Sequence, residues 1–521
     1  MKLLTVLSIS ILITASLLTA SNPATLAPAD NIIIVDITDD QFDASSGPGT
    51  CSLREAVTAA NTNAAFGGCS AGSSETMDVI QLSALTYTLT RAGSENINEF
   101  GDLDIYNPFI TGPGLFAPAI AIGTKIVGLG QGQTIIDGNE LDRVFDVIGS
   151  GVLWMTDLTI QDGHSINDDG KNGWGGGIYN AGLLTLGSVT VTHNSSGRDA
   201  STVGDKHGGG IYNSGTLYIS YSTISNNQTH NGSGPALYNG GNGGGIYNSA
   251  SGYGSLTDST VRDNLTGNGS SYACLCRGGH GGGIYNAGSF TIENSTISGN
   301  TTGNTSAAGT GGNGGGIYNA GTMSLLQSTL SGNTCGSNQI PSSDGGSGGA
   351  IYNSDTGSFS VAIDSTTISY NAAGNGKPAG KGGGIFNAAL AANVTLHNTI
   401  LALNNNPGNS YPECGGTITS NDYNLIYSIT GCTVNGSTTH NIPAGQDPLL
   451  GILRNNGGYT FTHALFLNSL AIDTGDNIDC GASDQRGVTR PIDGDLDGIA
   501  QCDIGAYESE QYFFMPLMFK P

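Results

Sequence analysis

The sequence predicts an all-β fold, a parallel β-helix with three short strands in every coil. The first observation is a hexapeptide, Gly-Gly-Gly-Ile-Tyr-Asn or a near-copy of it, that recurs through the middle of the chain. The second is its spacing, because the isoleucines of successive copies lie 33, 35, 38, 33, 34 and 34 residues apart. The third is that no helix-length apolar pattern lies between copies. A fixed period of this size is typical of a repeat architecture. The copies begin at Gly175, Gly208, Gly243, Gly281, Gly314, Gly348 and Gly382.

One repeat shows how the three strands arise. After Gly281, the runs Ile284–Asn286, Phe290–Ile292 and Ser295–Ser298 alternate apolar and polar residues and are separated by Gly and Asn turns. About five buried side chains stabilise such a coil by roughly 1.5–3 kcal/mol each, whereas ordering about 20 residues costs roughly 1–2 kcal/mol per residue. A single coil is therefore unstable and must stack on its neighbours. A β-propeller is the alternative, but the repeat is too short for the fourth strand of a blade.

These hexapeptides resemble the Gly-Gly-Ala-Ile and Phe-x-x-Asn repeats of chlamydial polymorphic outer-membrane proteins. They also resemble the wider group of pectate-lyase-like β-helices. The resemblance implies a single-stranded, right-handed solenoid. It is specific for the fold and implies little about function.

The N-terminal 29 residues are predicted to be a secretory signal peptide. Lys2 precedes the apolar run 3–18, and cleavage is expected after Ala20 or Ala29. The alternative is a single N-terminal anchor helix.

Residues 30–123 are predicted to cap the N-terminal end of the solenoid. Ser52 and Glu55 fit a capping box, which indicates the start of a short helix. The apolar face of that helix would be Leu53, Ala56, Val57 and Ala60. Cys51–Ala56 spells the motif of the CSLREA domain of bacterial surface proteins, which this segment resembles.

Residues 124–430 are assigned to β-helix repeats and residues 431–508 to a C-terminal cap. From Asp447 onward the chain resembles the choice-of-anchor Q domain of exported bacterial repeat proteins. The matching segments are Leu470–Gly475, Asp484–Pro491 and Cys502–Glu508. The resemblance implies display on a surface, although no LPxTG motif or long anchor helix shows how the chain is attached. Residues 509–521 form a short apolar tail, which is expected to be a sorting tail, a docking tail or a last strand.

Composition favours an exported, acidic rod. Of the 521 residues 11% are charged, and the formal net charge is −25. The 16 Lys and Arg residues form no basic stripe, so nucleic acid is not an expected partner. No segment of the mature chain has the ~18 apolar residues of a membrane span. The expected location is extracellular or on a bacterial cell surface, with an extracellular glycan or a surface protein as partner.

Nine cysteines in an exported chain indicate disulfides. Proximity in sequence pairs them as Cys51–Cys69, Cys414–Cys432 and Cys480–Cys502. The connectivity of Cys274, Cys276 and Cys335 stays open, and the odd count leaves one cysteine free.

A calcium site is the one cofactor expectation. The D-x-D-x-D-G spacing of a calcium loop occurs at Asp493, Asp495 and Asp497. Asp503 lies one residue before the position where such a loop has a bidentate Glu, which is Ile504 here. The alternative is an acidic surface turn paired with Arg486 or Arg490.

Two polar columns should follow the isoleucine column. If Ile points inward, the next residue points outward, so the tyrosines could contact sugar rings or simply stack on one another. These are Tyr179, Tyr212, Tyr247, Tyr285, Tyr318 and Tyr352, followed by Phe386. The asparagines are predicted to form a structural amide ladder. They are Asn180, Asn213, Asn248, Asn286, Asn319, Asn353 and Asn387.

The leading functional hypothesis is a non-enzymatic adhesion or surface protein that makes contact through its unequal inter-repeat loops, and no catalytic residue is assigned. The alternatives are a lyase or hydrolase of acidic polysaccharides and a purely structural rod. Gly279-His280-Gly281 and Asp168-Asp169 are similar to pieces of polygalacturonases, but they should lie three coils, about 15 Å, apart. Three carboxylates with a basic residue in one groove across adjacent coils would favour the enzyme.

Overall fold

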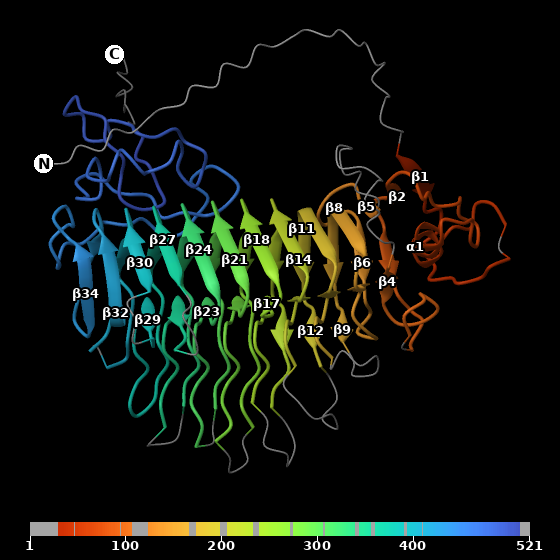
Figure 1. Ribbon diagram of the computed structural model, residues 1–521, viewed down its shortest axis with the longest axis horizontal. Coiled ribbons are helices and arrows are strands. Elements are labelled where there is room, and N and C mark those ends of the chain that lie inside the picture. The colour runs from red at the N-terminus through yellow and green to blue at the C-terminus, as the bar shows by residue number, and fades with distance from the viewer. Residues whose placement is uncertain are drawn as a thin grey trace, which may run out of the picture.

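The computed structural model describes residues 30–45, 47–93, 95–106, 123–165, 173–197, 206–232, 239–270, 275–305, 308–338, 343–355, 360–389, 393–408 and 410–510. The predicted signal peptide, residues 1–29, and residues 511–521 of the predicted tail lie outside these ranges. Within them the chain forms a parallel β-helix in which 31 strands join one ladder (Figure 1). The predicted all-β solenoid is therefore confirmed.

Three sheets run along the solenoid. The first contains the hexapeptide strands: β4 (Leu103–Ile105), β7 (Phe145–Val147), β10 (Ile178–Asn180), β13 (Ile211–Asn213), β17 (Ile246–Asn248), β20 (Ile284–Asn286), β23 (Ile317–Asn319), β26 (Ile351–Asn353) and β29 (Ile385–Asn387). The second contains β1 (Asn31–Ile34), β2 (Asp78–Gln81), β5 (Thr124–Val127), β8 (Val152–Gln161), β11 (Leu183–Thr192), β14 (Thr216–Ser220), β18 (Tyr253–Thr257), β21 (Ser289–Glu293), β24 (Thr322–Leu326), β27 (Val361–Asp364), β30 (Val394–His397), β32 (Cys414–Asn421) and β34 (Cys432–Ser437).

The third sheet contains β3 (Thr86–Thr88), β6 (Ile135–Asp137), β15 (Thr223–Ser225), β19 (Thr260–Arg262), β22 (Thr296–Ser298), β25 (Thr329–Ser331), β28 (Thr367–Ser369), β31 (Ile400–Ala402) and β33 (Leu425–Ile426). The long strands β8 and β11 bend from the second sheet into the third. A separate small sheet joins β9 (His164–Ser165), β12 (Ser195–Ser196) and β16 (Gln228–Thr229).

Identical positions of the repeat stack in register. Ile284 of β20 pairs with Ile246 on one side and Ile317 on the other, and the neighbouring tyrosines and asparagines pair likewise. All seven isoleucines of the hexapeptides are 0% exposed, so they form a continuous apolar core. The side-chain period of two then places each tyrosine on the outer face.

The predicted asparagine ladder is present. Asn180 Nδ2 donates to Asn213 Oδ1 at 2.7 Å, and the same bond repeats from coil to coil up to Asn387. These amides are buried, so each bond satisfies polar groups that would otherwise be costly inside the protein.

A second buried amide ladder was not predicted. In it the backbone N–H and the Nδ2 of each asparagine both donate to the Oδ1 of the next, as Asn264 does to Asn300 at 3.1 and 2.9 Å. Its members are Asn194, Asn227, Asn264, Asn300, Asn333, Asn371 and Asn404. The ladder ends on a carboxylate, because Asn404 N and Nδ2 donate to Glu413 Oε2 at 3.2 and 2.7 Å.

Glu413 makes stability depend on pH in a predictable direction. Burial raises the pKa of Glu413 to about 7, against hydrogen bonds from Asn404 that lower it. The folded protein therefore favours the neutral Glu413 carboxyl. The stability that this group contributes is complete below the unfolded pKa of 4.5 and is lost as the pH rises through 7. We expect Glu413→Gln, which keeps the acceptor, to match the wild type at pH 5 and to exceed it by roughly 2–3 kcal/mol at pH 8.

Urea unfolding of both proteins at several pH values measures this difference, with exposed Glu75→Gln as the matched control. A stability difference between Glu413→Gln and the wild type that does not change with pH would contradict the prediction.

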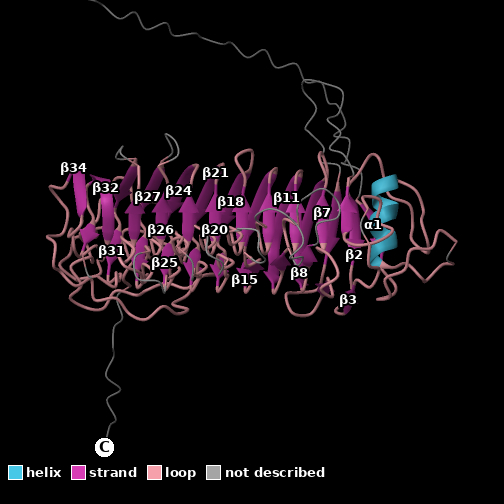
Figure 2. Ribbon diagram, turned by 90° about the horizontal axis from the view of Figure 1, so that it is seen from below, coloured by secondary structure: helices cyan, strands magenta, loops and turns pink. Residues whose placement is uncertain are grey.

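The N-terminal region belongs to the solenoid instead of preceding it. β1 pairs with β2 and β2 with β5, so the ladder starts at Asn31 and not at residue 124. The predicted helix exists as α1 (Leu53–Thr62), with the Ser52–Glu55 capping box formed. It lies at the N-terminal end of the rod (Figure 2), and its predicted apolar face is buried.

The C-terminal segment, residues 438–510, does not cap the end of the solenoid as predicted. It runs back along one side, over several coils (Figure 1). The threonines of the third sheet hold it: Thr296 donates to the Phe461 carbonyl at 2.6 Å and Thr329 to Gln485 Oε1 at 2.6 Å. Thr296, Thr329 and Thr367 stack at one position of the third sheet, and their hydroxyl groups form a row that hydrogen-bonds this segment along the flank of the solenoid.

The three disulfides expected from proximity are formed, namely Cys51–Cys69, Cys414–Cys432 and Cys480–Cys502. Cys276 is also in a disulfide, and Cys335 is buried and free. Cys274 lies outside the described ranges.

Candidate functional site

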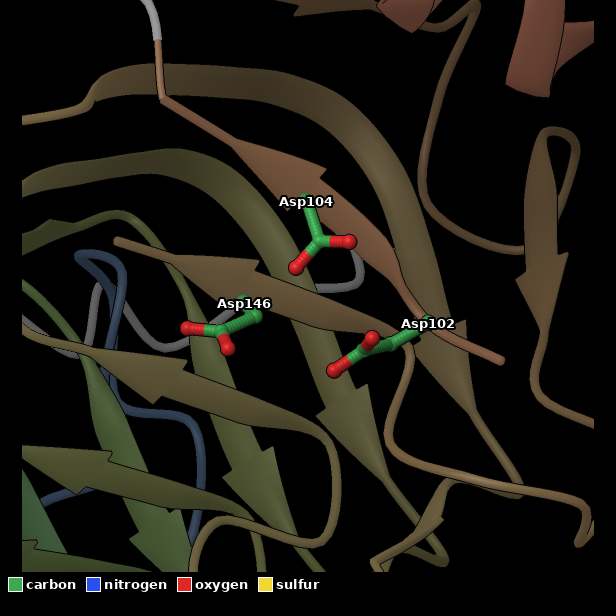
Figure 3. A group of neighbouring side chains, drawn as sticks. All are labelled: Asp102, Asp104 and Asp146. Atoms are coloured by element: carbon green, nitrogen blue, oxygen red, sulfur yellow. The ribbon is translucent and has the colours of Figure 1, made fainter. Parts of the chain in front are cut away.

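A buried group of three carboxylates lies near the N-terminal end of the first sheet (Figure 3). Asp104 of β4 pairs with Asp146 of β7, and Asp146 pairs in turn with Tyr179 of β10. Asp102 precedes β4, and its carboxylate lies so that one oxygen of each residue is within 4.8 Å of the others. The two aspartates thus occupy the positions that tyrosine takes in later coils.

Arginine and backbone groups compensate this negative charge. Arg143 Nη1 lies 3.1 Å from Asp102 Oδ2 and 3.7 Å from Asp146 Oδ2. Asn98 N donates to Asp104 Oδ2 at 3.3 Å. The three aspartates are at most 3% exposed, so solvent does not reach them. Three carboxylates can hold a hard cation, but here one cationic side chain already neutralises part of the group.

Sequence reasoning missed this group. The predicted N-terminal cap, residues 30–123, includes Asp102 and Asp104, whereas the ladder extends through β4 and brings them beside Asp146. The signal was present as an alternating Asp102-Leu103-Asp104, but only the strand register shows which residue it meets.

Two of the four predicted calcium ligands, Asp493 and Asp495, lie together, and they are joined by Asp473, which was not predicted. The carboxylate oxygens that come within 4.8 Å of one another belong to Asp473, Asp493 and Asp495. Asp497 Oδ1 instead accepts the Ile499 N–H at 2.8 Å. Asp503 is buried and accepts N–H groups of Asp473 and Ser509, and burial raises its pKa to about 6.

Local turns also use the carboxylates of this group. Asp473 Oδ2 accepts the N–H groups of Gly494 and Asp495 at 2.8 and 2.7 Å. These carboxylates therefore close turns of the C-terminal segment. Arg490, which was expected to pair with this turn, lies 3.2 Å from buried Glu508, and Arg486 lies 2.7 Å from Asp484.

The tyrosine column is occupied by its own rings. Adjacent tyrosine centroids from Tyr179 to Tyr352 lie 4.7 to 5.1 Å apart with planes within 9° of parallel. A sugar ring cannot enter between rings at this spacing. Arg143 lies over Tyr179 at one end, with its Cζ 5.8 Å from the ring centroid. At the other end, the Phe386 ring packs directly against Gly415, where an added Cβ would lie only 2.8 Å from the ring. The stacking of the tyrosines on one another is therefore present, and their contact with a sugar ring stays a prediction.

The residues that immediately precede the hexapeptides form a further ladder, and two of them are histidines, His207 and His280. His280 Nδ1 accepts the Asn313 N–H at 2.9 Å, and its ring stacks on Tyr318 with centroids 4.9 Å apart. His207 does the same with Asn242 and Tyr247. Burial lowers the pKa of His207 to about 3 and that of His280 to about 4, which keeps both rings neutral acceptors. His280 thus has a structural role, and Asp168 and Asp169 lie outside the described ranges.

A surface pocket of about 450 Å³ lies beside Tyr370, Tyr427 and Glu413. Glu413 is 1% exposed and already terminates the second amide ladder. The pocket therefore offers two aromatic side chains but no accessible carboxylate.

No known protein family and no curated protein matches this sequence. Among solved structures, the chain is similar to the crystal structure of pectate lyase Pel9A. The identity is 13% and the TM-score 0.45, and the match covers 92% of this chain and 97% of the other. The chain is also similar to the A-module of mannuronan C-5 epimerase AlgE4 from Azotobacter vinelandii, with 13% identity and a TM-score of 0.31, covering 77% and 96%. The β-helix assignment rests on the strand pairings themselves. The described residues include no helix with the length and apolar character that crossing a membrane requires.

Proposed function

We propose that this protein is an exported, non-enzymatic rod that contacts an extracellular glycan or a surface protein through its inter-repeat loops. The observation that carries this proposal is the placement of the loops. They project together from one side of the solenoid, opposite the C-terminal segment (Figure 1). The disulfides support export, because disulfides persist in oxidising surroundings.

The loops present a regular row of exposed amides. Asn268 N donates to Asn231 Oδ1, and Asn304 N to Asn268 Oδ1, both at 2.7 Å. Ser337 N continues the row to Asn304. Each side-chain oxygen is used by the next coil, whereas the Nδ2 groups make no hydrogen bond within the described chain. One exposed amide donor per coil, about 4.8 Å apart, suits the hydroxyl groups of an extended glycan.

The experiment is a glycan array and a cell-surface binding assay with the purified protein. We expect binding that Asn268→Ala combined with Asn304→Ala weakens at least about 10-fold, without loss of folding. Asn455→Ala, an exposed asparagine of the C-terminal segment, is the matched control. Absence of binding to any glycan or surface, or equal binding by the double variant, would refute the loop contact.

A second candidate function is an enzyme acting on acidic polysaccharide. The group of Asp102, Asp104 and Asp146 with Arg143 across adjacent coils favours it. Its burial argues against it, because a polymer cannot reach these side chains. Lyase and reducing-sugar assays on pectins distinguish the two, and activity lost in Asp146→Asn would replace the non-enzymatic proposal.

A further inference from the structure

The C-terminal end of the solenoid is an open strand edge. β34 pairs in parallel with β32 and, among the described residues, with no strand on its other side. All residues from Tyr427 to Asp447 are exposed or half-buried, whereas β32, the strand of the preceding coil that pairs with β34, has buried residues such as Ile418. Val434 is only partly buried where the core ends. Such an edge presents unpaired N–H and C=O groups, and β34 has neither a proline nor a lysine to block pairing.

This end of the molecule carries almost no charge. Between Tyr423 and Gln446 the sequence contains no Asp, Glu, Lys or Arg, although the whole chain has a formal charge of −25. His440, the single titratable side chain of the stretch besides tyrosine, lies 2.9 Å from Asp422. Acidic rods repel one another along the rest of their surface. The electrostatic cost of bringing two copies together is therefore lowest at this end. Exposed Ile429 and Tyr427 add apolar surface there.

The opposite end is built differently, as Figure 2 shows. The helix α1 lies across it with residues Leu53–Asn61 buried. Ser70 Oγ lies 3.3 Å from the carbonyl oxygen of Ile32 in the first strand. Among the described residues β1 also pairs on one side only, with β2, but Asp30, Asp36, Asp39 and Asp40 flank it and make that end acidic. The uncharged β34 end therefore meets the same end of another copy at the lower electrostatic cost. Such a contact is isologous and closes as a dimer instead of growing into a fibre.

We propose that two copies of this chain associate end to end through their β34 edges. The two strands run antiparallel about a twofold axis, which continues the hydrogen-bonded ladder across the contact. The pairing covers Val434 and the partly buried Ile442, where the solenoid core is otherwise left open. The result is a single rod of about twice the length, with an α1 helix at each end.

Light scattering and small-angle X-ray scattering on the full chain test this proposal. We expect a concentration-dependent dimer of the 52.8 kDa chain, with a maximum dimension close to double that of the monomer. Higher salt should strengthen the dimer, since it screens the repulsion between the acidic rods. Thr433→Glu combined with Asn435→Glu places like charges across the twofold and should weaken association at least about 10-fold.

The matched control is Ala362→Glu, because Ala362 is exposed and belongs to the same outward column as Asn435, through Thr395 and Thr419. It should dimerise like the wild type. A wild-type chain that stays monomeric, or a dimer that survives the β34 charges, would overturn the proposal. A chain that ends at Glu510 tests whether residues 511–521, and not a second copy, cover the β34 edge. If only this truncated chain dimerises, these residues cover the edge and the proposal fails for the intact protein.

Discussion

Gly282→Ala is expected to prevent stable folding of the rod, whereas Gly283→Ala leaves it folded. A Cβ at Gly282 would lie 2.3 Å from the Gly315 carbonyl oxygen of the next coil and 2.8 Å from the backbone of Thr301. Because both contacts are with backbone of the ladder, neither neighbour can move without breaking hydrogen bonds. At Gly283 the nearest atom, the Gly316 carbonyl oxygen, is 2.9 Å away.

The chain itself contains a test of this difference. Ala350 occupies the position of Gly283 in the sixth copy and is 0% exposed, so one extra methyl group fits there. We expect Gly282→Ala to cost more than about 3 kcal/mol, the upper range for overpacking, and Gly283→Ala about 1 kcal/mol. Denaturant unfolding followed by far-ultraviolet circular dichroism measures both. Equal losses of stability in the two variants would show that adjacent coils can move apart to make room for the methyl group at Gly282.

Asn300→Ala is expected to have the second-largest effect, a loss of roughly 3–5 kcal/mol. The amide of Asn300 accepts two hydrogen bonds from Asn264 and donates to Asn333 Oδ1 and the Val261 carbonyl at 2.9 and 3.0 Å. Alanine removes all four and leaves the buried N–H of Asn264 without its acceptor.

Exposed Asn304 of the same coil is the control, because its side chain supports a surface row only. Asn304→Ala should cost less than about 1 kcal/mol. Thermal unfolding compares the two variants. A small effect at Asn300 would mean that water replaces the amide inside the solenoid, and the ladder would then be a consequence of the fold and not a cause.

The repeated parts of the fold were predictable because each copy reports the same constraint. Seven isoleucines in one column, a Ser52–Glu55 capping box and neighbouring cysteine pairs are local or periodic signals, and the structure contains each of them. The second amide ladder had the same kind of signal, an asparagine after each third strand.

The candidate site depended on information that no local pattern carries. Asp104 meets Asp146 only through the register of β4 on β7, across a long stretch of chain. Asp473 joins Asp493 only after the C-terminal segment has folded back on itself. Likewise, the threonines that hold this segment look like ordinary strand residues until a partner arrives. Short-range spacing therefore predicted Asp493 and Asp495 but not Asp473, the carboxylate that joins them.

The C-terminal segment also alters how the rod should come apart. A solenoid with only nearest-neighbour contacts frays from its ends, one coil at a time. Here, hydrogen bonds between residues 78 to 189 positions apart, such as Asn398 with Asp476 and Thr296 with Gln485, fasten the inner coils to a common strap. These coils should unfold and exchange their amide hydrogens as one cooperative unit. A force applied at the C-terminus would peel the strap first, and the freed coils would then lose their mechanical resistance singly.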